Sequence, residues 1–227
     1  MDIPKPKKLA EDIADYLGER IIRQEIGAGE RIVEAVVAGQ FNVSHGPVRE
    51  AFQMLEKYHL VELIPRKGAR VKEFSVNDVR CLFEVMVELV RLIVRLCCSN
   101  RTDEEREKLL ELEKEAERSA VDQDLEGYFD TTYAYALLAL ETTRNRVLKQ
   151  MVLEWLPNMR RAYYLSISQS QNSLMDSATF LKSIMTCIAK QDARVAEATV
   201  MSHIEQEQAR ILKIVRDINH RQKINAA

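Results

Sequence analysis

Residues 42–56 read NVSHGPVREAFQMLE, and this stretch has the pattern of a tight turn followed by a short helix. Ser44 is a favourable N-cap, because its side-chain oxygen can accept a hydrogen bond from an N–H group of the first turn. Pro47 falls in that first turn, where the N–H that proline lacks would have no helical partner. Apolar side chains at helical spacing predict the buried face of the helix: Val48, Phe52 and Leu55.

Another face of the same helix carries long polar side chains. Arg49, Gln53 and Lys57 recur at every fourth position, so they share one side. Upstream, residues 32–41 predict a second short helix, and Asn42-Val43 is the linking turn, so the unit is a helix-turn-helix. A helix with one apolar side and one side of hydrogen-bond donors suits the major groove of DNA.

A β-hairpin is predicted directly after this unit. Residues 60–64, LVELI, alternate and are rich in β-branched side chains, and residues 70–72, RVK, predict the return strand. The turn between them holds Arg66 and Lys67 at its tip. A basic hairpin after a helix-turn-helix forms a winged helix, whose tip can reach a minor groove or a phosphate.

In order and spacing, these residues resemble the GntR family of bacterial transcription regulators. The resemblance rests on GERIVE at 29–34, PVREA at 47–51 and PRKGARV at 65–71, and it covers residues 8–73. It implies DNA contacts from the recognition helix and the wing. The residues expected to make them are Ser44, His45, Gly46, Arg49, Gln53, Arg66, Lys67 and Gly68.

The chain departs from the family pattern at both ends of the recognition helix. Relatives usually have Ser-Arg-Thr-Pro where this chain has Ser44-His45-Gly46-Pro47, so we expect its operator to differ from those of close relatives. At the other end, Tyr58-His59 replaces Glu-Gly. We therefore expect His59 to adopt the backbone conformation that glycine accepts more readily.

Charge is distributed unevenly along a nearly neutral chain. The formal net charge is -2, yet residues 44–72 hold six Lys or Arg and three Glu. Phosphate contacts depend on local charge, so near-neutrality does not exclude DNA binding. For Arg49, the alternative to DNA contact is an ion pair with Glu50 or Glu56.

Length and composition fit a globular, mainly helical protein. The chain has 227 residues, 46% hydrophobic and 30% charged, with 7 Gly and 5 Pro. No apolar run approaches the roughly 18 residues of a membrane span, and the N-terminus has no signal-peptide core, so we expect a cytoplasmic protein with no membrane association. Cys81, Cys97, Cys98 and Cys187 lack metal-type spacing and are expected to be reduced, mostly buried thiols.

From Ser75 onward the pattern is almost entirely helical. Helix starts are expected at Ser75, Thr102, Asp122 or Asp124, Asn145, Asn172 or Ser173, and Asp192. Six helices in about 150 residues favour an antiparallel bundle. The predicted fold class is mainly α: an N-terminal winged helix-turn-helix at residues 1–73, plus a C-terminal antiparallel six- to seven-helix bundle at residues 74–227.

The helical half is similar to the FCD-type effector domain of the FadR branch of the GntR family. The similarity covers residues 75–215 and is carried in the C-terminal part by Ile184, Asp192, Ala196, Met201 and His203. It implies a small effector inside the bundle, and in many relatives a divalent metal held by one Asp and three His. It also implies that the bundle forms the surface of a homodimer.

The metal-ligand positions of the family are mostly substituted here. Register places Thr132 at the aspartate position and Ala136 and Leu181 at two histidine positions, which leaves only His203. First-row metals require three or four N, O or S ligands, so we expect no metal and no other cofactor. Met86 stands where many relatives have an arginine that grips a carboxylate ligand.

The expected effector pocket is therefore unusually apolar for the family. An apolar or uncharged effector fits it better than a dicarboxylate, and the alternative is that side chains fill the cavity and the domain senses nothing. The residues expected to line the pocket are Met86, Thr132, Tyr135, Ala136, Arg160, Leu181 and His203.

Together these features predict a sequence-specific transcription regulator that binds a palindromic operator in double-stranded DNA as a homodimer and responds to a small effector. We expect no enzymatic activity, because the four histidines, at positions 45, 59, 203 and 220, are scattered and form no ligand cluster. A helical interaction protein that does not bind DNA is the alternative from another class, and the complete wing argues against it.

Overall fold

The computed structural model describes residues 6–65, 67–169 and 171–225, and the side chains of residues 8–65, 67–169 and 172–218. Contacts between residues divide the chain into two compact units. The first, here the winged-helix unit, comprises Met1–Phe74 and Leu153–Ala162, and the second, the helical unit, comprises Ser75–Val152 and Tyr163–Ala227. Each unit is described by itself.

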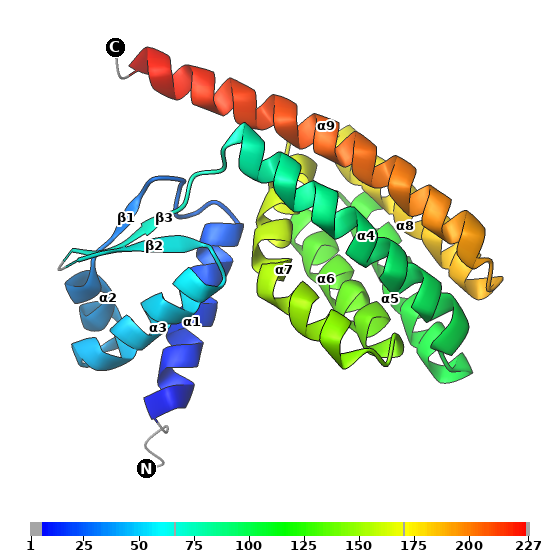
Figure 1. Cartoon of the computed structure of the whole chain (residues 1–227), viewed down its shortest axis with the longest axis horizontal. Coiled ribbons are helices and arrows are strands. Elements are labelled where there is room, and N and C mark those ends of the chain that lie inside the picture. The colour runs from blue at the N-terminus through cyan, green and yellow to red at the C-terminus, as the bar shows by residue number, and fades with distance from the viewer. Residues whose placement is uncertain (1–5, 66, 170, 226–227) are drawn as a thin grey trace. The chain divides into compact units, whose positions relative to one another are not determined.

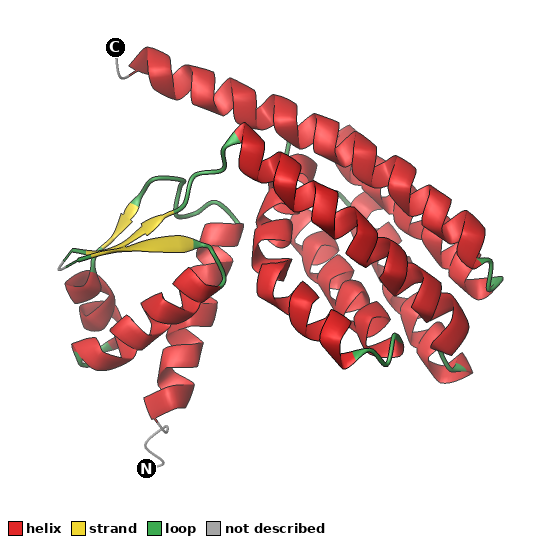
Figure 2. Cartoon of the chain, viewed as in Figure 1, coloured by secondary structure: helices red, strands yellow, loops and turns green. Residues whose placement is uncertain are grey.

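The winged-helix unit combines helices with a small antiparallel sheet (Figures 1 and 2). The strands lie in the order β1-β3-β2, and Ile32 pairs with Ala69 while Ile64 pairs with Gly68. The elements are α1 (Pro6–Ile22), β1 (Arg31–Ile32), α2 (Glu34–Phe41), α3 (His45–Lys57), β2 (Val61–Ile64) and β3 (Gly68–Val71). This is the winged helix-turn-helix that the sequence predicts.

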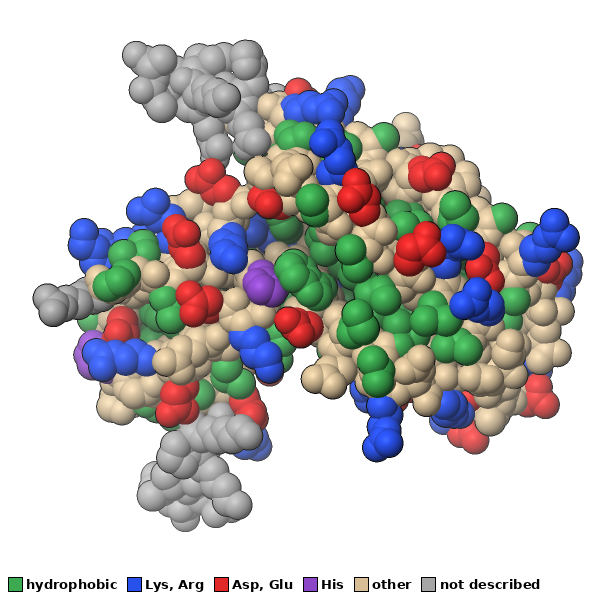
Figure 3. Space-filling model, viewed as in Figure 1, with side chains coloured by type: hydrophobic (Ala, Val, Ile, Leu, Met, Phe, Trp, Pro, Cys, Tyr) green, Lys and Arg blue, Asp and Glu red, His purple; other side chains and the backbone are tan. Residues whose placement is uncertain are grey.

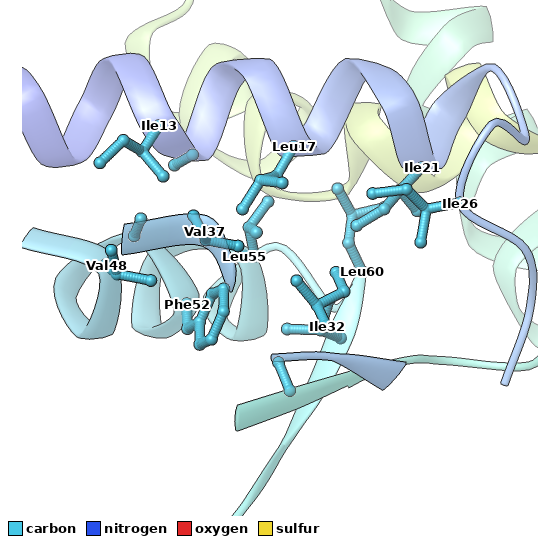
Figure 4. Packing of buried hydrophobic residues seen from close by; sticks show 14 of the residues in the cluster. Ile13, Leu17, Ile21, Ile26, Ile32, Val37, Val48, Phe52, Leu55 and Leu60 are labelled. Atoms are coloured by element: carbon cyan, nitrogen blue, oxygen red, sulfur yellow. The ribbon is translucent and has the colours of Figure 1, made fainter. Parts of the chain in front are cut away.

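One hydrophobic core holds this unit together (Figure 4). The predicted apolar face of α3 is confirmed, since Val48, Phe52 and Leu55 are at most 2% exposed. They pack with apolar residues of α1 such as Leu17, which is 1% exposed. Burying a side chain of this size stabilises the fold by about 1.5–3 kcal/mol, so this core fixes α3 on its scaffold.

The start of the second helix differs from the prediction. The helix expected over residues 32–41 begins at Glu34, because Ile32 belongs to β1 and pairs with β3. Ile32 is 6% exposed, so the strand places its side chain in the core. Ser44 occupies the N-cap position of α3 with extended backbone angles, but its side chain makes no capping hydrogen bond.

Two turns depend on left-handed backbone conformations. His59 has φ of 57°, which confirms the conformation expected where relatives have glycine. Gly68 has φ of 93°, and a Cβ atom built there would lie 2.2 Å from the carbonyl oxygen of Ile32. Only glycine fits at this point, where β3 begins beside β1.

The helical unit contains the helices that the capping signals predict. Ser75 and Thr102 each form a capping box, and the side chains of Asp124 and Asn145 accept hydrogen bonds from the first turns of their helices. The helix expected to start at Asn172 or Ser173 begins earlier, at Gln171. The elements are α4 (Val76–Asn100), α5 (Asp103–Val121), α6 (Leu125–Thr142), α7 (Arg146–Ile167), α8 (Gln171–Ala189) and α9 (Ala193–Asn225).

Helices of the bundle pack both on helices that are distant in sequence, as α4 does on α9, and on the next helix in the chain, as α5 does on α6. Helix α4 packs along α9, and α5 packs against both α6 and α8 (Figure 1). Cys97, Cys98 and Cys187 are buried and Cys81 is exposed, which confirms that most of the cysteines are buried. Burial raises the pKa of Cys98 to about 11, so this thiol stays protonated and unreactive. In the described part of the chain, no helix has the length and apolar character to cross a membrane.

Candidate nucleic-acid interface and effector site

Helix α3 presents one polar face to solvent. His45, Arg49 and Gln53 are exposed on it, one helical turn apart from one another, and the Arg49 side chain is 68% exposed. The opposite face is the core face of Val48 and Phe52. A rigid helix with this division can lay its donors along base edges without disturbing the fold.

Glu34, the first residue of α2, lies against this face, and the sequence analysis missed it. Its Oε2 accepts a hydrogen bond from Arg49 Nε at 3.0 Å, and its Oε1 lies 2.6 Å from His45 Nδ1. The hydrogen bond from Arg49 and the one from His45 lower the pKa of Glu34, so it is a carboxylate at neutral pH. The expected alternative partners of Arg49 were Glu50 and Glu56. The family-like stretch 29–34 contains Glu34 but gives no sign of this contact, because Arg49 lies fifteen residues further along the chain.

The N-terminus of α3 and the wing supply further candidate contacts. Ser44 and Gly46 are exposed where the helix begins, and backbone N–H groups at such an end suit a phosphate oxygen. Lys67 is exposed at the wing tip, and its carbonyl oxygen accepts a hydrogen bond from Arg31 Nε at 2.8 Å. Arg66, also expected to contact DNA, lies outside the described residues.

The α7 segment of the winged-helix unit lies against the end of the recognition helix. Asn158, 3% exposed, donates a hydrogen bond to the carbonyl oxygen of Tyr58 at 2.6 Å. His59 stacks on Trp155, with ring centroids 4.2 Å apart. Arg160 of this segment forms an ion pair with Glu19 of α1.

The seven expected pocket residues differ in their burial and in the unit to which they belong. Arg160 belongs to the winged-helix unit, whereas the others lie in the helical unit. Met86, Tyr135 and Leu181 are buried at 2%, 7% and 7% exposure. Thr132 is half-buried and Ala136 is exposed.

His203, one of the expected pocket residues, lines a groove on the helical unit. The groove has a volume of about 1060 Å³ and runs between α8 and α9. His203 stacks on Phe180 in its wall, with ring centroids 3.6 Å apart. Burial and, secondly, the charge of Arg210 lower the pKa of His203 to about 4, so the imidazole is neutral at neutral pH. Asp176 and Arg210 also line the groove, so it is more polar than the expected pocket.

The helical unit also contains a buried polar cluster that sequence patterns do not reveal. Tyr163 shares hydrogen bonds with Tyr128 at 3.3 Å and with Ser177 at 2.5 Å. Ser166 donates a hydrogen bond to Glu207 at 2.5 Å, and Glu207 is 5% exposed. Within the described residues, no group of three or more His, Cys, Asp and Glu side chains could hold a metal ion.

Two family models match the chain, and together they span most of it. Residues 9–71 match the model described as "Bacterial regulatory proteins, gntR family". Residues 81–206 match the model of the FCD domain. The first match covers the candidate DNA-contacting residues, and the second covers most of the helical unit, including Phe180 and His203 of the groove.

Curated proteins with similar sequences are regulators as well. The Nta operon transcriptional regulator of Aminobacter aminovorans is 29% identical over 192 residues, 83% of this chain and 87% of the relative. The uncharacterized HTH-type transcriptional regulator YdhC of Bacillus subtilis is 29% identical over 154 residues, 67% of each protein. Among solved structures, E. coli McbR/YncC superposes with a TM-score of 0.80, covering 90% of this chain and 97% of that one at 18% identity. This last likeness concerns the fold.

Proposed function

The chain is a transcription regulator of the gntR family of bacterial regulatory proteins and carries an FCD domain, and from this premise we propose that α3 and the wing bind a specific operator. The observation that carries the proposal is the exposed face of α3, where His45, Arg49 and Gln53 stand in a row on a helix fixed by its core. Lys67 at the wing tip adds a cation for a phosphate. No catalytic activity is part of this proposal.

The test is DNA binding measured at several salt concentrations. Operator sequences are first selected from a random DNA pool with the full-length protein. Affinity for the selected sequence should exceed that for scrambled DNA by a factor of about 10³ or more, and both affinities should fall as salt rises. Equal affinity for selected and scrambled DNA would exclude sequence-specific regulation.

The regulator is proposed to act as a homodimer on a palindrome. One recognition helix reads only a few base pairs, so two symmetric copies give the specificity a regulator requires. The helical unit offers apolar surface for such contact, since Val85, Val147 and Met151 are 57%, 68% and 49% exposed. Figure 3 shows hydrophobic side chains gathered on the face of this unit that carries α4. Sedimentation at micromolar concentration should give twice the monomer mass.

The effector is proposed to be a small uncharged molecule that binds the helical unit beside His203. A neutral imidazole stacked on Phe180 provides a flat surface and a hydrogen-bonding ring edge. Mass spectrometry of small molecules that copurify with the protein identifies the effector class. In His203→Ala these molecules should no longer copurify with the protein. In the control variant Lys114→Ala, which changes an exposed residue of α5, they should still copurify.

A second candidate is a regulator of the same family whose helical unit senses nothing. It is favoured by the dense interior of that unit, where Tyr128, Phe129 and Ile188 are at most 1% exposed. In that case no small molecule copurifies, and a screen of uncharged metabolites leaves both the melting temperature and the operator affinity unchanged.

A further inference from the structure

The side chains of His45 and Arg49 meet on a single carboxylate. Glu34 Oε1 lies 2.6 Å from His45 Nδ1 and 2.9 Å from Arg49 Nε, while Oε2 lies 3.0 Å from the same Nε. The Glu34 side chain is only 19% exposed, whereas the His45 and Arg49 side chains are 56% and 68% exposed. Because both exposed side chains bind the same nearly buried carboxylate of Glu34, their orientations toward a ligand are restricted.

For Arg49, the contact determines which edge of the guanidinium faces outward. Glu34 engages Nε, so the terminal amino groups Nη1 and Nη2 can face a base. Two parallel donors match the O6 and N7 acceptors of guanine in the major groove. Restricting a long side chain before binding also lowers the entropy lost on binding.

For His45, the contact determines which ring nitrogen carries the proton. An ionised carboxylate only accepts hydrogen bonds, so Nδ1 must donate to Glu34. In the neutral ring Nε2 is then an acceptor. An acceptor in the major groove pairs with an exocyclic amino group, N6 of adenine or N4 of cytosine.

We propose that Glu34 is a positioning residue that sets the base preference of α3. It directs Arg49 toward a guanine and His45 toward an amino-bearing base, adenine or cytosine, at a nearby base pair. This inference rests on the proposed operator binding. It differs from a purely structural role, in which Glu34 would join α2 to α3 and affect only stability.

The experiment measures full-length wild type and variants on the selected operator and on all its single-base variants. Glu34→Gln keeps the size of the side chain but removes its negative charge and one of its two acceptor oxygens. We expect discrimination at the two base positions to fall about tenfold, with affinity for scrambled DNA little changed. Glu50→Gln is the control, because Glu50 is an exposed glutamate on α3 and its loss changes the net charge equally.

The outcomes separate the two claims. If wild type shows no base preference, the proposed operator binding is wrong. If wild type discriminates and Glu34→Gln discriminates equally well, the positioning role is wrong and operator binding stands. A lower melting temperature with unchanged discrimination also overturns the inference, because it indicates a structural role alone.

Two further variants cover the case in which Glu34→Gln does not fold. Glu34→Asp keeps the charge but is one methylene shorter, so at least one of the two contacts should break and discrimination at that base should fall. His45→Ala removes an exposed side chain and should abolish preference at its own base position only. Unchanged discrimination in either folded variant overturns the inference.

Discussion

The recognition helix and the helical unit place their candidate functional residues in different ways. His45, Arg49 and Gln53 share one face of one helix, so the period of the helix brings them together. The expected pocket residues come from several helices, and the structure leaves Ala136 exposed, buries Leu181 and puts Arg160 in the other unit. A site on one element follows from local pattern, whereas a site between elements depends on how each helix is rotated.

The largest effect is expected for Arg49→Ala, which removes a side chain from the site on the single element. Loss of a guanine or phosphate contact should cost about 1–3 kcal/mol per half-site, so a dimer loses specific binding almost completely. Circular dichroism should show an intact fold, because the side chain is 68% exposed. Lys114→Ala is the control. Unchanged operator affinity for Arg49→Ala would mean that another face of α3 reads the DNA.

The second largest effect is expected in the folding stability of the helical unit at low pH. The pKa of His203 in the folded protein is about 4, below its ordinary value of 6.5. Between these two pH values the unfolded chain therefore binds a proton that the folded chain does not. Stability from this residue is therefore complete above pH 6.5 and is lost as pH falls to 4, by up to about 3 kcal/mol.

His203→Phe keeps the ring stack on Phe180 and removes the titrating group. Denaturant unfolding at several pH values between 7 and 4 should show a shallower loss of stability in the variant than in wild type. Parallel curves for the two proteins would show that His203 titrates in its ordinary range.

A smaller effect is expected for the wing. Lys67→Ala should weaken binding to every DNA sequence alike and reduce the slope of log affinity against log salt by about 1, since a phosphate contact carries no base information. Anisotropy titrations of selected and scrambled DNA at four salt concentrations measure both slopes. A change in base preference would instead place Lys67 in a groove.

The smallest effect is expected for divalent metals. We expect Thr132, Ala136 and Leu181 at three of the four metal-ligand positions of the family. Zn²⁺, Ni²⁺ and Mn²⁺ should therefore leave the melting temperature unchanged, and so should EDTA. Stoichiometric metal in the purified protein, lost in His203→Ala, would contradict this prediction and would mean that other residues complete a site around His203.

Much of the fold could be predicted because its signals are local. Ser75 and Thr102 marked helix starts through capping boxes, and Val48, Phe52 and Leu55 marked a buried face by spacing. The helix expected from residue 32 began two residues later, because pairing of Ile32 with β3 is a contact distant in sequence.

The candidate sites could be predicted from the sequence less completely than the fold. The exposed face of α3 followed from its period, but the contact of Glu34 with Arg49 spans fifteen residues, and no local pattern announces it. The buried pair Ser166 and Glu207 was missed for the same reason, since its members lie on α7 and α9. A buried polar pair of this kind becomes visible only when the packing of the helices is known.

The central claim is that two copies of this chain read a palindrome through α3, and one measurement tests it most directly. Full-length protein is titrated against the selected full operator and against a single half-site in a duplex of the same length, at one salt concentration. The account predicts a complex of two chains per full operator and affinity for the half-site lower by a factor of about 100 or more. Equal affinity for both duplexes, with one chain bound to each, would contradict it.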